Sequence, residues 1–217
     1  MTDEATTVQG LPRLGMPAPQ FEVSTTHGTI RLDDFRGSWL VLFSHPADFT
    51  PVCTTEFIGF ANIRGQLQEL NCELLGLSID SVYAHIAWVR NIEEKMGVKI
   101  DFPVIADLNK VVASLYGMVS PGESKTETSR CVFVIDVNQV LRAMIYYPLT
   151  TGRNMDEILR LIRALQTSDE KGVATPANWQ PGDKVIIPPP QTQEAAEERV
   201  ADESLECTDW YFCKKSL

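Results

Sequence analysis

The chain has 217 residues, 44% of them hydrophobic, which suffices for one full core with an appended segment. Its formal net charge of −10 argues against nucleic acid or an anionic membrane surface as a partner, because both reward clustered Lys and Arg. No run approaches the roughly 20 apolar residues of a membrane-spanning helix and residues 1–6 lack a signal-peptide pattern, so we expect a cytoplasmic protein.

Hydrophobic periodicity predicts alternating strands and helices from about residue 21 to residue 166. Apolar runs of strand length stand at residues 40–43, 73–79, 132–135 and 140–146, the last two separated by a turn at 136–139. The clearest helix covers 155–166, with Asn154 as its N-cap and Glu157 as the capping-box partner. Alternating βα units followed by a hairpin favour an α/β domain with a mixed central sheet.

The stretch from Pro46 to Cys53 lies between the first apolar strand and a helical pattern. Thr50 fits the N-cap and Pro51 the first helical position, which places Cys53 third in the helix with its backbone N–H unpaired. A thiolate there lies at the positive end of the helix, so the pattern predicts a cysteine prepared for nucleophilic attack. The competing interpretation is a simple capped turn with a small, buried and inert cysteine.

The composition changes after Thr167. Residues 172–190 contain five prolines and few helical signals, which predicts an extended segment without a core of its own. Residues 191–206 are acidic and helix-prone, and the aromatic residues of 207–213 are predicted to be buried against a partner subunit. We therefore expect a catalytic domain over 1–167 and a dimerisation arm over 168–217.

The cysteines are odd in number and scattered, which does not fit a secreted disulfide framework but fits reversible thiol chemistry in a reducing compartment. Cys72 and Cys131 lie within apolar runs and are predicted to be core residues. The remaining two, Cys207 and Cys213, do not have CxxC spacing, and the chain has three histidines, so no zinc or other metal site is expected.

The string of residues 43–56 resembles the peroxiredoxin signature, in which a proline stands four residues before a threonine and a cysteine three residues after it; here these are Pro46, Thr50 and Cys53. It is similar to the one-cysteine subfamily typified by peroxiredoxin 6. The same resemblance extends to residues 129–130, 147–154, 176–179 and 188–190. It implies a thioredoxin-like fold, homodimers that assemble into a decamer as a pentamer of dimers, and thiol-dependent reduction of hydrogen peroxide and organic hydroperoxides without a cofactor.

The resemblance also implies roles for individual residues. Cys53 is the peroxidatic cysteine, which attacks the peroxide and becomes a sulfenic acid. The Thr50 hydroxyl bonds the thiolate or the peroxide, Arg130 supplies a permanent positive charge, and Pro46 shields the pocket from water.

Three further residues are candidates in the same site. Arg153 resembles a second active-site arginine of the subfamily, and Glu56 is expected to orient Arg130. His45, eight residues before Cys53, is a candidate for polarising Cys53 or bonding its oxidised form, although a structural role remains the alternative.

The two cysteines near the C-terminus depart from a strict one-cysteine enzyme. We expect the sulfenic acid at Cys53 to condense with Cys213, or alternatively with Cys207, to give a disulfide that a thioredoxin-like donor or a small thiol then reduces. The alternative is that both are packing residues and an external thiol resolves Cys53. As a second function, the same cysteine would serve a redox-controlled holdase or signal relay.

Overall fold

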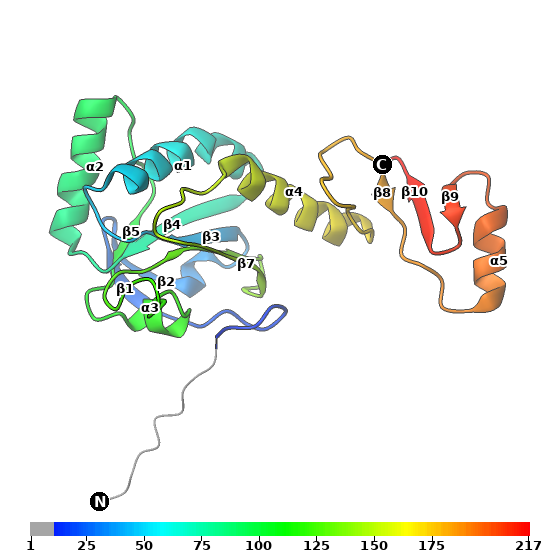
Figure 1. Ribbon diagram of the computed structural model, residues 1–217, viewed down its shortest axis with the longest axis horizontal. Coiled ribbons are helices and arrows are strands. Elements are labelled where there is room, and N and C mark those ends of the chain that lie inside the picture. Colours follow the sequence, from blue (N-terminus) through cyan, green and yellow to red (C-terminus); the bar gives the residue numbers. More distant parts are fainter. Residues whose placement is uncertain (1–10) are drawn as a thin grey trace, which may run out of the picture. The chain divides into compact units, whose positions relative to one another are not determined.

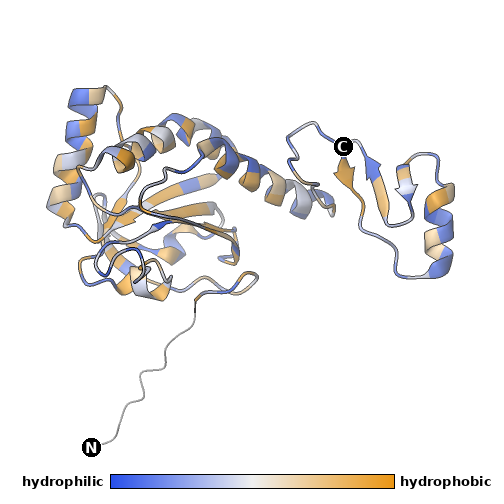
Figure 2. Cartoon of the chain, in the orientation of Figure 1, coloured by the Kyte–Doolittle hydropathy of each residue, from blue (hydrophilic) through white to orange (hydrophobic). Residues whose placement is uncertain are grey.

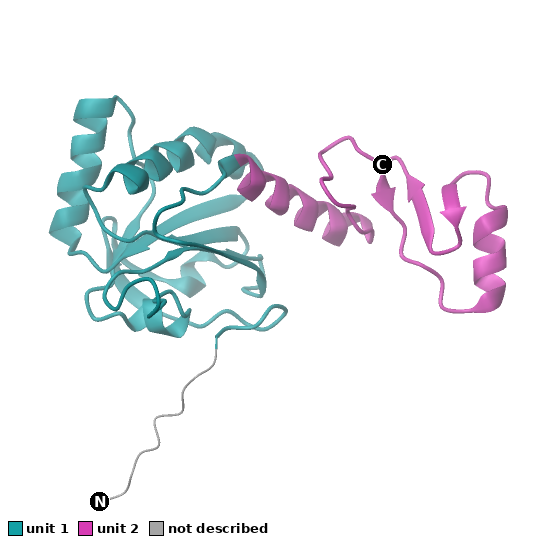
Figure 3. Ribbon diagram, in the orientation of Figure 1, with its two compact units in different colours: residues 1–155 teal, residues 156–217 magenta. Residues whose placement is uncertain are grey.

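The computed structural model describes residues 11–217. The chain divides into two compact units, drawn in different colours in Figure 3, with the division between Met155 and Asp156. The first unit contains a seven-stranded mixed sheet with helices, and the second contains a small three-stranded sheet. Within the described residues, no helix combines the length and the apolar character needed to cross a bilayer.

The sheet of the first unit has the strand order β2-β1-β5-β4-β3-β6-β7 (Figure 1). Its strands are β1 (Glu22–Thr25), β2 (Gly28–Arg31), β3 (Trp39–Ser44), β4 (Cys72–Ser78), β5 (Val104–Ala106), β6 (Arg130–Ile135) and β7 (Leu141–Tyr147). The strands β3, β4 and β5 run parallel, whereas β6 pairs antiparallel with β3 and with β7. Because β3 has a neighbouring strand on each side, it is a central strand of the sheet. Folds of the α/β class commonly bind their ligands just beyond the carboxyl ends of such strands.

Every residue of β3 is buried, so both of its faces are covered. Leu40 and Leu42 point into one core cluster, to which η1 (Leu32–Phe35) and α3 (Val111–Leu115) also contribute. On the other face Phe43 stacks on Phe60 of α1 (Pro51–Glu69) at 4.0 Å between ring centroids, and Phe57 of α1 lies 4.4 Å from Trp88 of α2 (Val82–Met96). Figure 2 shows the resulting hydrophobic colouring along the central strands.

The four strands expected from apolar runs correspond to β3, β4, β6 and β7, each within two residues of its predicted bounds. The hairpin expected at 136–139 joins β6 to β7, and its Gln139 adopts a positive φ of 64° that the turn requires. The prediction of an α/β domain with a mixed central sheet is therefore confirmed.

The second unit contains most of α4 (Met155–Lys171), then β8 (Val185–Ile186), α5 (Gln193–Ala201), β9 (Glu206–Asp209) and β10 (Phe212–Lys215). The acidic helix expected within 191–206 is present as α5. The expectation that 172–190 has no core of its own was wrong. Trp179 is 3% exposed, packs in a cluster with Ala164, Val173 and Val185, and donates its indole N–H to the Asp183 carbonyl at 3.1 Å. One large aromatic side chain thus fixes a proline-rich segment.

Candidate active site

Cys53 lies at the beginning of α1, directly after the loop that leaves β3, and its side chain is fully buried. The predicted positions are confirmed, since Thr50 occupies the N-cap and Pro51 the first helical residue. The Thr50 hydroxyl does not cap the helix but donates to the Ala47 carbonyl at 2.9 Å. Pro46 is buried in the same loop. The loop therefore encloses the sulfur while leaving the Thr50 oxygen with lone pairs to accept further hydrogen bonds.

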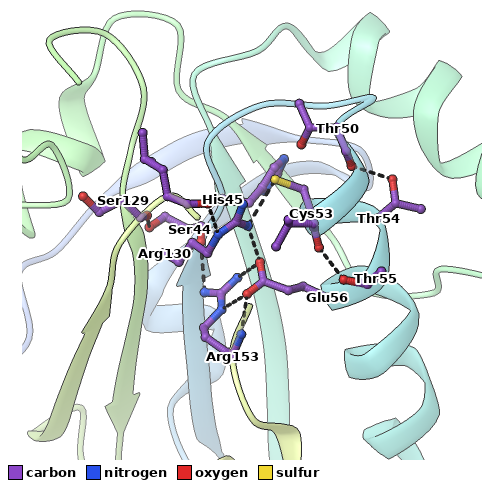
Figure 4. Close-up of polar contacts among 12 residues, drawn as sticks. Ser44, His45, Thr50, Cys53, Thr54, Thr55, Glu56, Ser129, Arg130 and Arg153 are labelled. Atoms are coloured by element: carbon purple, nitrogen blue, oxygen red, sulfur yellow. Dashed lines mark hydrogen bonds and ion pairs between the residues drawn. The ribbon is translucent and has the colours of Figure 1, made fainter. Parts of the chain in front are cut away.

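Arg130, the first residue of β6, brings its guanidinium to Cys53 (Figure 4). Its Nη1 donates to the Cys53 Sγ at 3.3 Å, and its Nε and Nη2 donate to the Leu149 carbonyl at 2.9 and 2.8 Å. The side chain is almost completely buried. The permanent positive charge of Arg130 is therefore fixed beside the Cys53 sulfur.

Glu56, one turn along α1 from Cys53, is shared by two arginines (Figure 4). Its Oε2 accepts from Arg130 Nη1 at 2.7 Å and from Arg153 Nη2 at 2.8 Å, and its Oε1 accepts from Arg153 Nε at 2.8 Å. Burial alone would raise the pKa of Glu56, but the Arg153 and Arg130 charges outweigh it and hold the pKa below its usual value. Two guanidinium groups and one carboxylate leave one positive charge for the Cys53 thiolate.

Arg153 joins the ends of two strands to this cluster. Its Nη1 donates to the Ser44 carbonyl at 2.9 Å and to the Cys131 carbonyl at 2.8 Å, at the end of β3 and the beginning of β6. Its guanidinium also lies 5.2 Å from the Phe43 ring centroid and 5.4 Å from that of Phe60. Arg153 therefore acts on the site through Glu56 and the strand ends.

His45 belongs to a buried network whose other members, Asp48 and His85, were not predicted. Asp48 Oδ1 lies 2.8 Å from His45 Nε2, and Asp48 Oδ2 lies 2.7 Å from His85 Nδ1. His85 Nε2 is 3.1 Å from the Ile105 carbonyl oxygen, so each ring nitrogen of His85 faces an oxygen atom. The Asp48 carboxylate accordingly bridges His45, at the end of β3, and His85 on α2.

Burial lowers the pKa of His45, more than the Asp48 hydrogen bond raises it, and this keeps the imidazole neutral. A neutral His45 that donates Nε2–H to Asp48 has its lone pair at Nδ1. Among the residues that the structure describes, this buried Nδ1 has no hydrogen-bond partner. The network therefore presents a bare acceptor nitrogen at the carboxyl end of β3. The ligand-type atoms of His45, Asp48 and His85 lie within 4.8 Å of one another, and their short N···O contacts are those of hydrogen bonds.

The remaining cysteines differ from Cys53. Cys72 and Cys131 are free and buried, as predicted, and burial raises the pKa of Cys72 to about 12 and that of Cys131 to about 11. In the second unit Cys207 on β9 and Cys213 on β10 form a disulfide with each other. The sequence left open which of them reacts with Cys53, and it did not indicate that they pair with each other.

Comparison with protein families gives two matches. The AhpC/TSA family model matches residues 14–144, and the model of the C-terminal domain of 1-Cys peroxiredoxin matches residues 164–203. A curated peroxiredoxin of Aquifex aeolicus is 57% identical over 221 aligned residues, covering 97% of this chain and 99% of the relative. A peroxiredoxin of Thermotoga maritima is 53% identical, covering 95% of this chain and 98% of the relative.

Solved structures give the same result. A yeast mitochondrial 1-Cys peroxiredoxin superposes with a TM-score of 0.85 at 41% identity, covering 95% of this chain and 100% of that one. A cysteine-to-serine mutant of peroxiredoxin 6 of Arenicola marina gives a TM-score of 0.84 at 38% identity, covering 94% of this chain and 97% of that one. Both agree with the thioredoxin-like fold that the sequence resemblance implied.

Proposed function

Because the chain belongs to the AhpC/TSA family of peroxiredoxins and is a thiol peroxidase, we propose that Cys53 is the sulfur that attacks the peroxide. One observation carries this assignment: the Arg130 Nη1 donates to the Cys53 Sγ at 3.3 Å, and both side chains are buried. Cys72 and Cys131 have pKa values raised to about 12 and about 11 by burial, so they remain protonated thiols at neutral pH.

In the proposed reaction the Cys53 thiolate attacks one peroxide oxygen, the O–O bond breaks, and the other oxygen leaves as water or an alcohol after taking a proton. Cys53 becomes a sulfenic acid. Thr50 positions the peroxide through its hydroxyl, Pro46 keeps bulk water out, and Arg130 stabilises charge on both sulfur and the leaving oxygen. We infer that hydrogen peroxide and small organic hydroperoxides are the substrates.

Glu56, Arg153 and His45 have supporting parts. Glu56 fixes the orientation of Arg130, and Arg153 fixes Glu56. We propose that His45 Nδ1, which is buried and has no hydrogen-bond partner among the described residues, accepts a hydrogen bond from the sulfenic acid hydroxyl that forms at Cys53. These three are therefore proposed as positioning residues around one nucleophile.

The Cys207–Cys213 disulfide supports resolution by a cysteine of the second unit. The Cys53 sulfenic acid condenses with the Cys213 thiol, releasing water; Cys207 then displaces Cys53 and leaves the disulfide between the two. Cys207 as the first attacking thiol is the alternative. A thioredoxin-like donor or a small thiol closes the cycle; the yeast relative is described with a thiol resolving mechanism that runs through glutathione and thioredoxin systems.

We also propose that two chains associate through the arm of residues 168–217, outside the catalytic domain of 1–167, and that dimers assemble as a pentamer of dimers. Large apolar side chains that are exposed in the single chain support such assembly: Trp210 (41%) and Tyr211 (56%) lie in the arm, and Tyr83 (81%) lies in the first unit. The free thiols of the first unit are consistent with a reducing compartment, and we propose the cytoplasm.

The assignment of Cys53 is tested with Cys53→Ser, using Cys72→Ser as the matched control because Cys72 is also a free, buried cysteine. We expect Cys53→Ser to consume peroxide only at the rate of the thiol reductant alone, whereas Cys72→Ser keeps wild-type turnover. Intact-mass analysis after one equivalent of peroxide detects the added oxygen or the new disulfide, and peptide mapping then locates it. Wild-type turnover by Cys53→Ser would exclude the assignment.

A further inference from the structure

Ser44 is the last residue of β3 and the only one in that strand with a hydroxyl group. Its side chain is fully buried. A buried hydroxyl costs free energy unless it is hydrogen-bonded, so its partners show what it stabilises. The partners of the Ser44 oxygen lie on β6 and on the residue before it, one on each side of Arg130 along the chain.

The Ser44 hydroxyl spans the backbone of Arg130. Its Oγ donates to the Ser129 carbonyl at 2.6 Å and accepts from the Cys131 N–H at 3.2 Å. That carbonyl and that N–H belong to the two peptide groups that flank the Arg130 Cα, and Figure 4 shows Ser44 and Ser129 beside Arg130. The Cys131 N–H also lies 3.1 Å from the Ser129 carbonyl oxygen, so the backbone bends at Arg130 as in a γ-turn. One hydroxyl therefore closes the turn that has Arg130 at its centre.

Backbone pairing does not hold this turn on the β3 side. The ladder between β3 and β6 ends at Phe43, opposite Val132. Beyond that pair the Arg153 guanidinium binds carbonyl oxygens of both strands, but these are not the two groups that the Ser44 hydroxyl binds. The Ser44 oxygen therefore takes the place of the ladder at the peptide groups on either side of Arg130.

The backbone at Arg130 determines where its side chain starts, and fixed contacts determine where it ends. The guanidinium donates to Glu56 and to the Leu149 carbonyl at 2.7 to 2.9 Å, whereas its contact with the Cys53 Sγ is 3.3 Å. If the turn opened, the oxygen acceptors would still retain the guanidinium, but Nη1 would shift relative to the sulfur. Hydrogen bonds weaken steeply with such changes of distance and angle.

We propose that Ser44 is a positioning residue of the peroxidase site. Its hydroxyl holds the backbone turn at Arg130 and thereby directs the guanidinium to Cys53. This inference rests on the proposed function of Cys53, and it adds a residue that acts through the main chain of Arg130. The competing explanation is that the hydroxyl only satisfies buried backbone groups and contributes to stability.

Two substitutions at Ser44 separate positioning from stability. Ser44→Ala removes the hydroxyl, whereas Ser44→Thr keeps it and adds a methyl group at a fully buried position. We expect kcat/KM for hydrogen peroxide to fall about tenfold in Ser44→Ala. Ser44→Thr should keep kcat/KM near the wild-type value although its free energy of unfolding falls. If kcat/KM followed the loss of stability in both variants, Ser44 would have a structural role only.

Thr25 provides the matched control. Its hydroxyl is also buried, donates to the Gly28 carbonyl at 2.8 Å and accepts from the His27 N–H at 3.0 Å, at the end of β1. We expect Thr25→Ala to lower the free energy of unfolding as Ser44→Ala does, with kcat/KM unchanged. A similar fall of kcat/KM in both alanine variants would overturn the proposal, because the loss of any buried hydroxyl would then slow the enzyme.

A double-mutant cycle tests the route through Arg130 and does not depend on the folding of Ser44→Thr. In the Arg130→Met background there is no guanidinium to direct, so we expect Ser44→Ala to cause no further fall of kcat/KM. A further tenfold fall in the double variant would show that Ser44 acts independently of Arg130 and would overturn the proposal.

Alkylation of Cys53 by iodoacetamide at neutral pH measures the same positioning without peroxide. The positive charge beside the sulfur promotes its attack on the reagent, so we expect slower alkylation in Ser44→Ala than in Thr25→Ala. Equal rates would overturn the role of Ser44 and leave Cys53 as the proposed nucleophile. Conversely, wild-type peroxide turnover by Cys53→Ser would remove the proposed function, while the comparison of alkylation rates would still decide the role of Ser44.

Discussion

The two sulfur sites of this chain have opposite surroundings. Cys53 is enclosed, and its nearest charged group is the guanidinium of Arg130, held by Glu56 and by a backbone carbonyl. The Cys207–Cys213 disulfide lies on a small hairpin, has carbonyl oxygens near both sulfurs, and leaves Cys207 partly exposed. A sulfur that reacts with a small peroxide is best served by a closed cationic pocket, whereas one that exchanges with a protein needs access.

We expect the largest effect when the positive charge beside Cys53 is removed, because that charge is what distinguishes this sulfur site from the disulfide. In Arg130→Met the thiolate loses its charged donor and Glu56 keeps only Arg153, so we expect kcat/KM for peroxide to fall by about 10²–10³-fold. Stopped-flow peroxide consumption measures the fall, and the ultraviolet absorbance of the thiolate measures its cause. The control Arg31→Met removes a surface arginine whose partner is Glu22. An unchanged thiolate absorbance in Arg130→Met would contradict the electrostatic explanation.

Glu56→Gln tests how much the buried carboxylate that binds Arg130 and Arg153 contributes to stability. It leaves two buried guanidinium groups without their carboxylate, and we expect the free energy of unfolding to fall by about 3 kcal/mol. Because the folded-state pKa of Glu56 is below the unfolded value of 4.5, its contribution is present above that value and is lost as pH falls through the folded pKa. Urea unfolding over a range of acidic pH measures both effects.

The matched control for that variant is Glu22→Gln, which removes an exposed ion pair with Arg31 and should cost little at any pH. If Glu22→Gln and Glu56→Gln flattened the acid dependence equally, the buried cluster would not be its source.

His45 should also make the free energy of unfolding fall as the pH falls, but by a smaller amount than Glu56. Burial lowers its pKa in the folded protein, so the unfolded chain binds more protons as pH falls below the ordinary value of 6.5. We expect the wild-type protein to lose stability between neutral pH and about pH 5, and His45→Gln to flatten that slope. The exposed His27 provides the control, since His27→Gln should leave the slope as it is.

Cys72→Ala should have the smallest effect. The thiol is buried in β4, its pKa is raised to about 12 by burial, and it does not ionise at neutral pH. We expect unchanged peroxide turnover and a loss of about 1 kcal/mol in the free energy of unfolding, from lost packing alone. A marked loss of turnover, measured alongside chemical denaturation, would show that contact with Arg130 is not what distinguishes the reactive Cys53 from an inert buried thiol.

The part of the site that could be predicted from the sequence is the part whose residues are neighbours along the chain. The helix beginning at Pro51 and the position of Cys53 follow from a strand, a turn and a helical repeat, and resemblance added Arg130. His85 was missed because it reaches Asp48 from 37 residues away, on α2. No spacing rule connects those two elements, and only the packing of α2 against the sheet brings them together.

The second unit was harder to predict for a different reason. Cysteine spacing does not determine pairing, and the Cys207–Cys213 disulfide becomes evident only once β9 and β10 form a hairpin. The small core around Trp179 was also missed. The proline content of the segment excludes regular helices, but it does not tell whether one aromatic side chain packs with residues far from it in the sequence.

The sharing of Glu56 between Arg130 and Arg153 has a consequence for oxidative damage. The pocket is neutral while Cys53 is a thiolate, but it carries one uncompensated positive charge once the sulfur becomes a neutral sulfenic acid. A sulfinate would restore neutrality as well as a thiolate does. Electrostatics therefore gives no defence against irreversible inactivation, and the enzyme's survival at high peroxide depends on how soon a second thiol arrives.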